Sequence, residues 1–188
     1  MKVYVIRHGE SENNVKKHWT GWMDVPLTEK GRMQASRTAR YLTDVPFDRV
    51  YASDLIRACD TAELALPGCT YEKSALLREI NVGSLAGHPV SCLSEEEYRK
   101  AHADGYAEFG GESRAELRQR TADFLKLLEN SGCGNVAVFC HAGWIRTMLD
   151  LVVGTPVKQK SLLCGNCTIG IFEFTGIHWR LHSWINHD

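Results

Sequence analysis

The chain has 188 residues, a length that fits one domain over residues 1–188 with a substantial core. Its formal net charge of -1 at pH 7 gives no reason to expect a nucleic-acid or membrane partner. No apolar run is long enough for a signal peptide or a membrane span. Seven cysteines without such a signal predict free thiols in a reducing compartment, so we expect a cytoplasmic protein.

The predicted elements begin with the apolar run Val3–Ile6, which indicates a short buried strand. Residues 9–27 contain glycine, asparagine, proline and scattered aromatic residues without sustained periodicity, which is typical of a long functional loop. Thr28 is a suitable N-cap for a helix over residues 29–42.

Residues 48–52 predict a second strand, and either Ser53 or Asp54 could cap the helix that follows it. This helix should end at about residue 66, immediately before a Pro-Gly pair. Residues 71–73 then predict a third, brief strand.

Two helix starts have the capping-box spacing, in which a serine is followed three residues later by a glutamate. Ser94 and Glu97 begin one helix, and Ser113 and Glu116 begin a longer amphipathic helix. The apolar stripe predicted for the longer helix consists of Leu117, Thr121, Phe124, Leu125 and Leu128.

The last third of the chain predicts a near-continuous apolar strand over residues 135–140 and an apolar helix over residues 142–153. Two more strands follow, over residues 168–174 and 178–184, with a tight turn between them. Strands that alternate with helices predict an α/β fold with a largely parallel central sheet and an antiparallel edge. We expect a three-layer α/β/α sandwich.

Two of the predicted strands end in a histidine. The run Val3–Ile6 leads directly into Arg7 and His8, and the apolar run 135–140 leads into His141. In an α/β sheet the carboxyl ends of the strands form the crevice where ligands bind, so these side chains are candidates for a functional site. The alternative is that the histidine is an ordinary core residue and the arginine is solvated.

Four segments carry a resemblance to a known family: Arg7–Ser11, Asn14, Thr20–Gly31 and His141–Gly143. Together they resemble the histidine phosphatase superfamily, the phosphoglycerate mutase-like proteins, and the resemblance extends from residue 3 to about residue 174. It implies a phosphoglycerate mutase-like fold in which the two strands that end in histidine are neighbours.

The resemblance also implies roles for five residues. His8 would attack phosphorus and carry the phosphoryl group as phosphohistidine, because a neutral imidazole is a competent nucleophile near pH 7. Arg7 and Arg57 would neutralise the phosphate oxygens, whose geometry guanidinium groups match. His141 would be a charged hydrogen-bond donor, and Glu79 would protonate the leaving oxygen and then activate water. Alternatively, Arg57 is an exposed helix arginine and Glu79 is a surface carboxylate beside the preceding arginine.

The loop after the first strand resembles the substrate-contact segment of that family. Asn14, Thr20 and Gly21 would contact the phosphate or the adjoining group, a role that is compatible with ordering the loop through turn hydrogen bonds. The resemblance requires no metal, because arginines neutralise the charge, and no cofactor is expected. Cys164 and Cys167 form a lone Cys-x-x-Cys pair without a second pair at zinc-finger spacing, so we interpret them as ordinary thiols.

Within the superfamily, most features of the sequence favour the phosphatases over the mutases. Thr20–Gly31 looks like a mutase loop, but residues 80–87 resemble the phosphatase branch, with Ala86 in place of its usual glutamate. The mutases' histidine-tyrosine-glycine motif is lacking, and Ala142 follows the second histidine where mutases usually have glycine. The chain is also shorter than typical mutases. A more open site favours hydrolysis, because a mutase must keep water from its phosphohistidine.

We therefore predict a metal-independent phosphomonoester hydrolase whose partner is a small-molecule phosphate ester. Residues 87–112 would form a cap-like insertion over the leaving group, but they contain no code that identifies the ester, and no oligomeric state is predicted. Two alternatives stay open, a cofactor-dependent phosphoglycerate mutase and a binding module that keeps the fold without turnover. Retention of both histidines and both arginines argues against the binding module.

Overall fold

The centre of the fold is a mixed β-sheet. The computed structural model describes residues 1–155 and 162–186, and within them the sheet has six strands in the order β3-β2-β4-β1-β5-β6. The strands are β1 (Lys2–Arg7), β2 (Arg49–Ser53), β3 (Glu72–Ser74), β4 (Asn135–Cys140), β5 (Ile169–Phe174) and β6 (Trp179–Ile185). Strands β3, β2, β4 and β1 are parallel, whereas β5 and β6 form an antiparallel edge. The predicted sheet is therefore confirmed.

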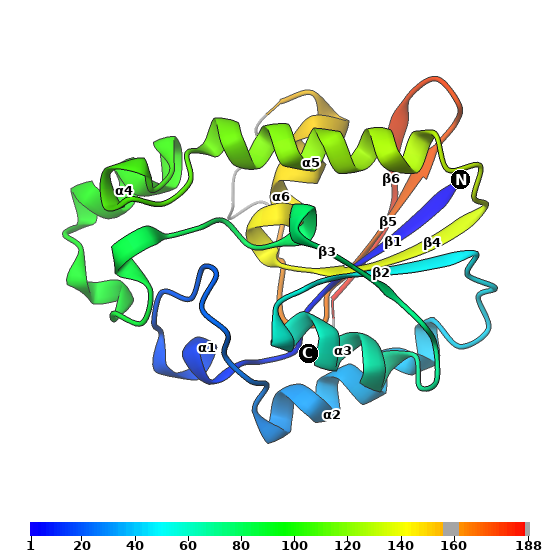
Figure 1. Ribbon diagram of the computed structural model, residues 1–188, viewed down its shortest axis with the longest axis horizontal. Coiled ribbons are helices and arrows are strands. Elements are labelled where there is room, and N and C mark those ends of the chain that lie inside the picture. The colour runs from blue at the N-terminus through cyan, green and yellow to red at the C-terminus, as the bar shows by residue number, and fades with distance from the viewer. Residues whose placement is uncertain (156–161, 187–188) are drawn as a thin grey trace.

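Helices cover both faces of this sheet (Figure 1). The helices are α1 (Glu12–Lys16), α2 (Glu29–Thr38), α3 (Ile56–Ala65), α4 (Glu95–Asp104), α5 (Arg114–Glu129) and α6 (Ala142–Val153). Helices α5 and α6 lie on one face and α2 and α3 on the other, while α1 and α4 lie beyond the end to which the parallel strands point. This arrangement is the predicted three-layer α/β/α sandwich.

Alternation along the strands divides the core into two clusters, because successive side chains of a strand point to opposite faces. Val3 and Val5 of β1 pack in one cluster with Phe124 of α5 and Trp144 of α6. Ile6 packs in the other cluster with alanines of α3. The predicted stripe of α5 is buried throughout, and each fully buried large apolar side chain contributes about 1.5–3 kcal/mol. Buried apolar side chains thus pack against both faces of the sheet.

The start of α3 differs from the prediction. The helix begins at Ile56, and neither Ser53 nor Asp54 caps it. Instead, the carboxylate of Asp24 in the preceding long loop accepts a hydrogen bond from the Ile56 amide at 2.8 Å. Ser53 ends β2, and its hydroxyl lies 2.8 Å from Nε2 of His141 and accepts from the Leu55 amide at 3.4 Å, but it caps no amide of α3. The long loop is therefore tied to α3.

Other local predictions are met closely. Both capping boxes are present, at Ser94 for α4 and at Ser113 for α5. The segment 9–27 is irregular except for the five-residue helix α1. All seven cysteines are free thiols. In the two described ranges, no helix is both long and apolar enough to cross a membrane.

Candidate active site

The two histidines at the strand ends lie side by side. Strands β1 and β4 are parallel neighbours, with Arg7 opposite Cys140, so the next residue of each strand lies at the same edge of the sheet. The ring centroids of His8 and His141 are 5.2 Å apart, and the ring planes are inclined at 59°. The adjacency that the family resemblance implied is therefore present.

A pocket of about 170 Å³ opens at this edge of the sheet. The residues predicted for the site that line it are Arg7, His8, Asn14, Thr20, Gly21, Arg57 and Glu79. His141 differs from them, because it is fully buried beside His8 and is not part of the lining. Among residues 87–112, His102 and Tyr106 contribute to the wall. The structure thus brings together side chains from segments far apart in the chain.

The surroundings of His8 define its protonation. Its Nδ1 lies 2.7 Å from the carbonyl oxygen of Gly9, and since a carbonyl only accepts hydrogen bonds, Nδ1 carries the proton. The lone pair of a neutral ring is then on Nε2. Burial, together with the positive charges of Arg57 and Arg7, holds the pKa of His8 well below its usual range. His8 is therefore a neutral imidazole with an unprotonated Nε2 at neutral pH.

Arg57 is buried rather than exposed on α3, so the alternative interpretation as a surface arginine is wrong. Its guanidinium donates from Nη1 to the carbonyl of Met23 and from Nη2 to the carbonyl of Gly21, both at 2.9 Å. Burial lowers the pKa of Arg57 to about 10, so the group keeps its charge at neutral pH. The long loop thus orients this cation toward the pocket it shares with His8.

Arg7 is held by the segment that precedes β5, where its Nη1 donates to the carbonyl of Cys164 at 2.6 Å. In the described parts of the chain, six buried side-chain polar atoms have no hydrogen-bond partner. Four of them are Nε of Arg7, Arg57 and Arg146 and Nδ1 of His141. Because buried polar atoms normally have partners, this concentration of unpartnered nitrogens, three of them on arginines, is typical of a site that binds an anion.

The protonation state of His141 differs from the one that the resemblance implied. Its Nε2 lies 2.8 Å from the hydroxyl of Ser53. Burial is the main cause that holds the pKa of His141 well below its usual range, and the charge of Arg57 adds to it. The expected charged donor is therefore a neutral ring in these surroundings. A dianionic phosphate next to the ring would favour the protonated form.

The Glu79 carboxylate is held at the start of α6. Its Oε1 accepts a hydrogen bond from the Ile80 amide at 2.9 Å, and its Oε2 accepts one from the Gly143 amide at 3.1 Å. The neighbouring Arg78 pairs with Asp54 at 2.6 Å. Glu79 is half-buried and lines the pocket, so the alternative interpretation as a surface carboxylate beside Arg78 is wrong.

The loop residues have structural functions besides lining the pocket. The side-chain oxygen of Asn14 accepts from the Ser11 amide at 3.1 Å, which orders the loop. Gly21 has a φ of +50°, and a Cβ there would approach Cγ2 of Val82 to 2.7 Å, so the position requires glycine. Thr20 also lines the pocket. Ordering of the loop and contact with a ligand are compatible here.

Several residues of the site region were not predicted from the sequence, among them Ser53, Arg114 and Arg146. Ser53 contacts His141, and Arg114 and Arg146 line the pocket. A signal existed for Ser53, because it ends a strand parallel to the two strands that end in histidine. Arg146 also had one, because it lies about one turn into the helix that follows His141. Arg114 is the first residue of α5, and helix periodicity alone does not distinguish it from a solvated arginine.

Comparison with known proteins identifies the class. Residues 3–187 match the family model of the histidine phosphatase superfamily (branch 1). The chain belongs to this superfamily of enzymes, as the resemblance of its motifs predicted.

The relatives include both mutases and phosphatases. A protein of Erwinia tasmaniensis named "Probable phosphoglycerate mutase GpmB" is 33% identical over 198 residues, which cover 98% of this chain and 90% of the relative. Among solved structures, phosphoserine phosphatase from Entamoeba histolytica in complex with 3-phosphoglyceric acid has a TM-score of 0.84 at 29% identity, covering 99% of this chain and 97% of that chain.

Two further solved structures also span both activities. Mycobacterial glucosyl-3-phosphoglycerate phosphatase has a TM-score of 0.85 at 26% identity, covering 97% of this chain and 98% of that chain. Phosphoglycerate mutase from Thermus thermophilus has a TM-score of 0.78 at 28% identity, and both chains are fully covered. The fold is therefore common to solved structures named as mutases and as phosphatases.

The lowered pKa values of His8 and His141 predict a pH-dependent stability. Below about pH 6.5, the ordinary histidine value, the unfolded chain binds protons that the folded chain does not. The free energy of unfolding should therefore decrease as pH falls from 7.5 to 5.5, by up to about 1.4 kcal/mol per pH unit for each histidine. Urea titrations across this range measure the slope, which His141→Gln should reduce. A flat profile would contradict the assignment of neutral buried rings.

Proposed function

We propose that this protein is a phosphomonoester hydrolase that acts on a small phosphorylated metabolite through a phosphohistidine intermediate on His8. The observation that carries the proposal is the unprotonated Nε2 of His8 in a pocket shared with Arg7 and Arg57. Nucleophile and charge neutralisation thus come from the protein's own side chains, and the proposed reaction proceeds without a metal.

The proposed reaction has two steps. In the first, which starts from the protonated form of Glu79, Nε2 of His8 forms a bond to phosphorus while the bond from phosphorus to the ester oxygen breaks, and Glu79 gives its proton to that oxygen. In the second, Glu79 takes a proton from water as the water oxygen attacks phosphorus. The P–N bond then breaks, inorganic phosphate leaves, and His8 and Glu79 return to their starting states.

The other side chains would stabilise the transferring phosphoryl group. Arg7 and Arg57 neutralise the charge on its equatorial oxygens, which is the main requirement of phosphoryl transfer. His141 would become protonated beside the bound dianion and donate to it. Asn14 and Thr20, from the long loop, would contact the phosphate or the group next to it.

The pocket supports a small substrate. Its volume of about 170 Å³ is below the roughly 300–1,000 Å³ of sites for drug-sized ligands. Trp19 and Tyr106 form part of the wall, so the leaving group would pack against aromatic rings. Residues 87–112, which include Tyr106, are proposed to act as a cap over the leaving group.

A second candidate is a cofactor-dependent phosphoglycerate mutase. It is favoured by the relative at 33% identity that bears a mutase name and by the mutase-like loop Thr20–Gly31. The two candidates share the phosphohistidine step and differ in what accepts the phosphoryl group, which is water in a phosphatase and a substrate hydroxyl in a mutase.

One assay separates the candidates. The enzyme is supplied with chelator and either p-nitrophenyl phosphate, phosphorylated sugars, nucleotides, α-ribazole phosphate or 3-phosphoglycerate, and released phosphate and isomerised product are followed together. We expect chelator-resistant release of phosphate from a subset of the esters. Conversion of 3-phosphoglycerate to 2-phosphoglycerate without net release would show a mutase. Silence in both readouts, with His8 never phosphorylated, would favour a binding module.

A further inference from the structure

The stretch that carries Glu79 has no regular secondary structure. Residues 78–82 connect two short 3-10 turns, Ala75–Leu77 and Gly83–Leu85, and belong to neither helix nor strand. Backbone groups in such a stretch lack the partners that a helix or a sheet provides, so they need others. The position of Glu79 therefore depends on side chains from other parts of the fold.

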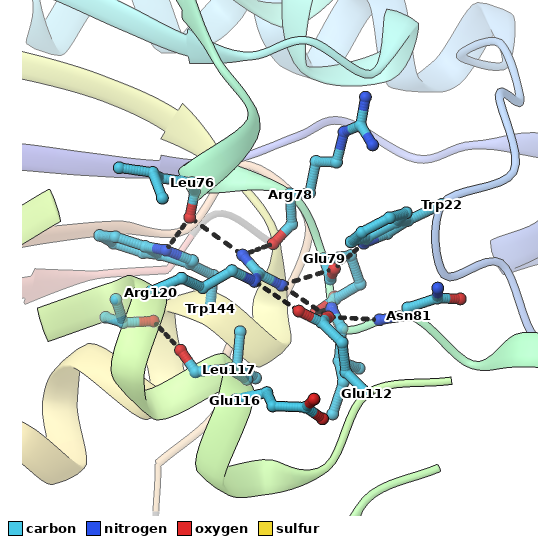
Figure 2. A network of polar contacts seen from close by, with 12 residues as sticks. Trp22, Leu76, Arg78, Glu79, Asn81, Glu112, Glu116, Leu117, Arg120 and Trp144 are labelled. Carbon is cyan, nitrogen blue, oxygen red and sulfur yellow. Dashed lines mark hydrogen bonds and ion pairs between the residues drawn. The ribbon is translucent and has the colours of Figure 1, made fainter. Parts of the chain in front are cut away.

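Arg120, in the second turn of α5, supplies most of those partners (Figure 2). Its Nη1 donates to the carbonyls of Leu76 at 2.9 Å and Arg78 at 2.6 Å, and its Nη2 donates to the carbonyl of Glu79 at 2.8 Å. One guanidinium thus holds three carbonyls within four consecutive residues. Arg120 does not line the pocket, so its contact with the site is through this backbone.

Glu112 completes the arrangement from the other side. Its carboxylate accepts from Nε of Arg120 at 2.8 Å and from Nη2 at 3.0 Å, and it also accepts from the Asn81 amide at 2.8 Å. All five N–H donors of Arg120 are therefore used. The two side chains are only 13% and 14% exposed, so this is a nearly buried bidentate pair, which is geometrically specific.

Two tryptophans reinforce the same carbonyls. Nε1 of Trp22, in the long loop, donates to the carbonyl of Glu79 at 2.7 Å, and Nε1 of Trp144 donates to the carbonyl of Leu76 at 2.9 Å. Each of these two oxygens then receives two donors, which matches its two lone pairs. Figure 2 shows that the donors approach from separate elements around the stretch.

We propose that Arg120, locked by Glu112, is a positioning residue that fixes the Glu79 carboxylate for proton transfer to the leaving group. The inference rests on the proposed function, in which Glu79 is the general acid. General acid catalysis requires the donor within hydrogen-bond reach of the leaving oxygen, and a misplacement of about 1 Å can reduce the rate roughly 100-fold. Loss of Arg120 removes one donor from each of three carbonyls in residues 76–79. The carbonyls of Leu76 and Glu79 keep a tryptophan donor, whereas that of Arg78 does not.

The test compares kcat/KM for an alkyl phosphate and for p-nitrophenyl phosphate in Arg120→Lys and Arg120→Met. Arg118→Met is the matched control, because Arg118 is exposed two residues earlier on the same helix. Since Arg120→Met leaves the buried Glu112 carboxylate unpaired, the double variant Arg120→Met/Glu112→Gln provides a form without either charge. Circular dichroism and thermal melting establish that each variant is folded.

We expect the alkyl ester to lose roughly 10- to 100-fold in kcat/KM while the aryl ester loses much less, since the aryl oxygen needs little protonation. When Glu79→Gln is already present, adding Arg120→Met should not increase the difference in kcat/KM between the two esters. Equal losses on both esters in folded variants, or additive losses in the variant that carries both substitutions, would overturn the inference. A wild-type enzyme that hydrolyses neither ester and forms no phosphohistidine would instead refute the proposed function.

Discussion

Replacement of His8 by alanine should abolish phosphate release, with a loss of roughly 10⁴- to 10⁶-fold in kcat. The variant lacks the Nε2 lone pair that forms the bond to phosphorus, and the neighbouring His141 is buried beneath the lining of the pocket. Phosphate release measures the loss. Labelling with a radioactive ester checks its cause, because an acid-labile phosphohistidine should form only when His8 is present.

The fold should survive this substitution. His8 makes one side-chain hydrogen bond, to the carbonyl of Gly9, and its burial as a neutral ring costs stability at low pH rather than adding to it. His182→Ala is a suitable control, because His182 is exposed on β6. If His8→Ala retained more than about one hundredth of the wild-type activity while folded, the nucleophile would have to be another group.

The sequence predicted best those features that depend on neighbours in the chain. Both capping boxes, at Ser94 and Ser113, are formed between residues three positions apart. The apolar stripe of α5 and the bounds of the strands follow from periodicity, which local burial imposes directly. The strand ends at His8 and His141 could be located in the same way.

Contacts between segments that are distant in the chain could not be predicted in this way. Asp24 caps α3 from 32 residues away, and Ser53 meets His141 across 88 residues. Arg120 reaches the Glu79 carbonyl across 41 residues. Each partner depends on the order of the strands in the sheet, which differs from their order in the chain. The resemblance to a family supplied the adjacency of the two histidines, but it did not supply these supporting partners.

Replacement of Glu79 by glutamine should reduce kcat/KM for alkyl phosphates by roughly 10²- to 10⁴-fold, the usual contribution of general acid-base catalysis. For p-nitrophenyl phosphate the loss in kcat/KM should be much smaller, because its leaving oxygen departs as a stable anion. The comparison uses kcat/KM because this ratio covers only the steps up to departure of the leaving group. In contrast, kcat should fall for both esters, because the same carboxylate activates the water in the second step.

Gly143→Ala tests the position of this carboxylate without removing it. A Cβ at Gly143 would overlap Oε1 of Glu79, so the carboxylate has to move away from the start of α6. Alanine favours a helix by about 1 kcal/mol over glycine, so the variant should be at least as stable as the wild type in thermal melting. We therefore expect a stable protein with the same preference for aryl esters as Glu79→Gln. Equal losses in kcat/KM for alkyl and aryl esters in either variant would show that Glu79 is not the general acid.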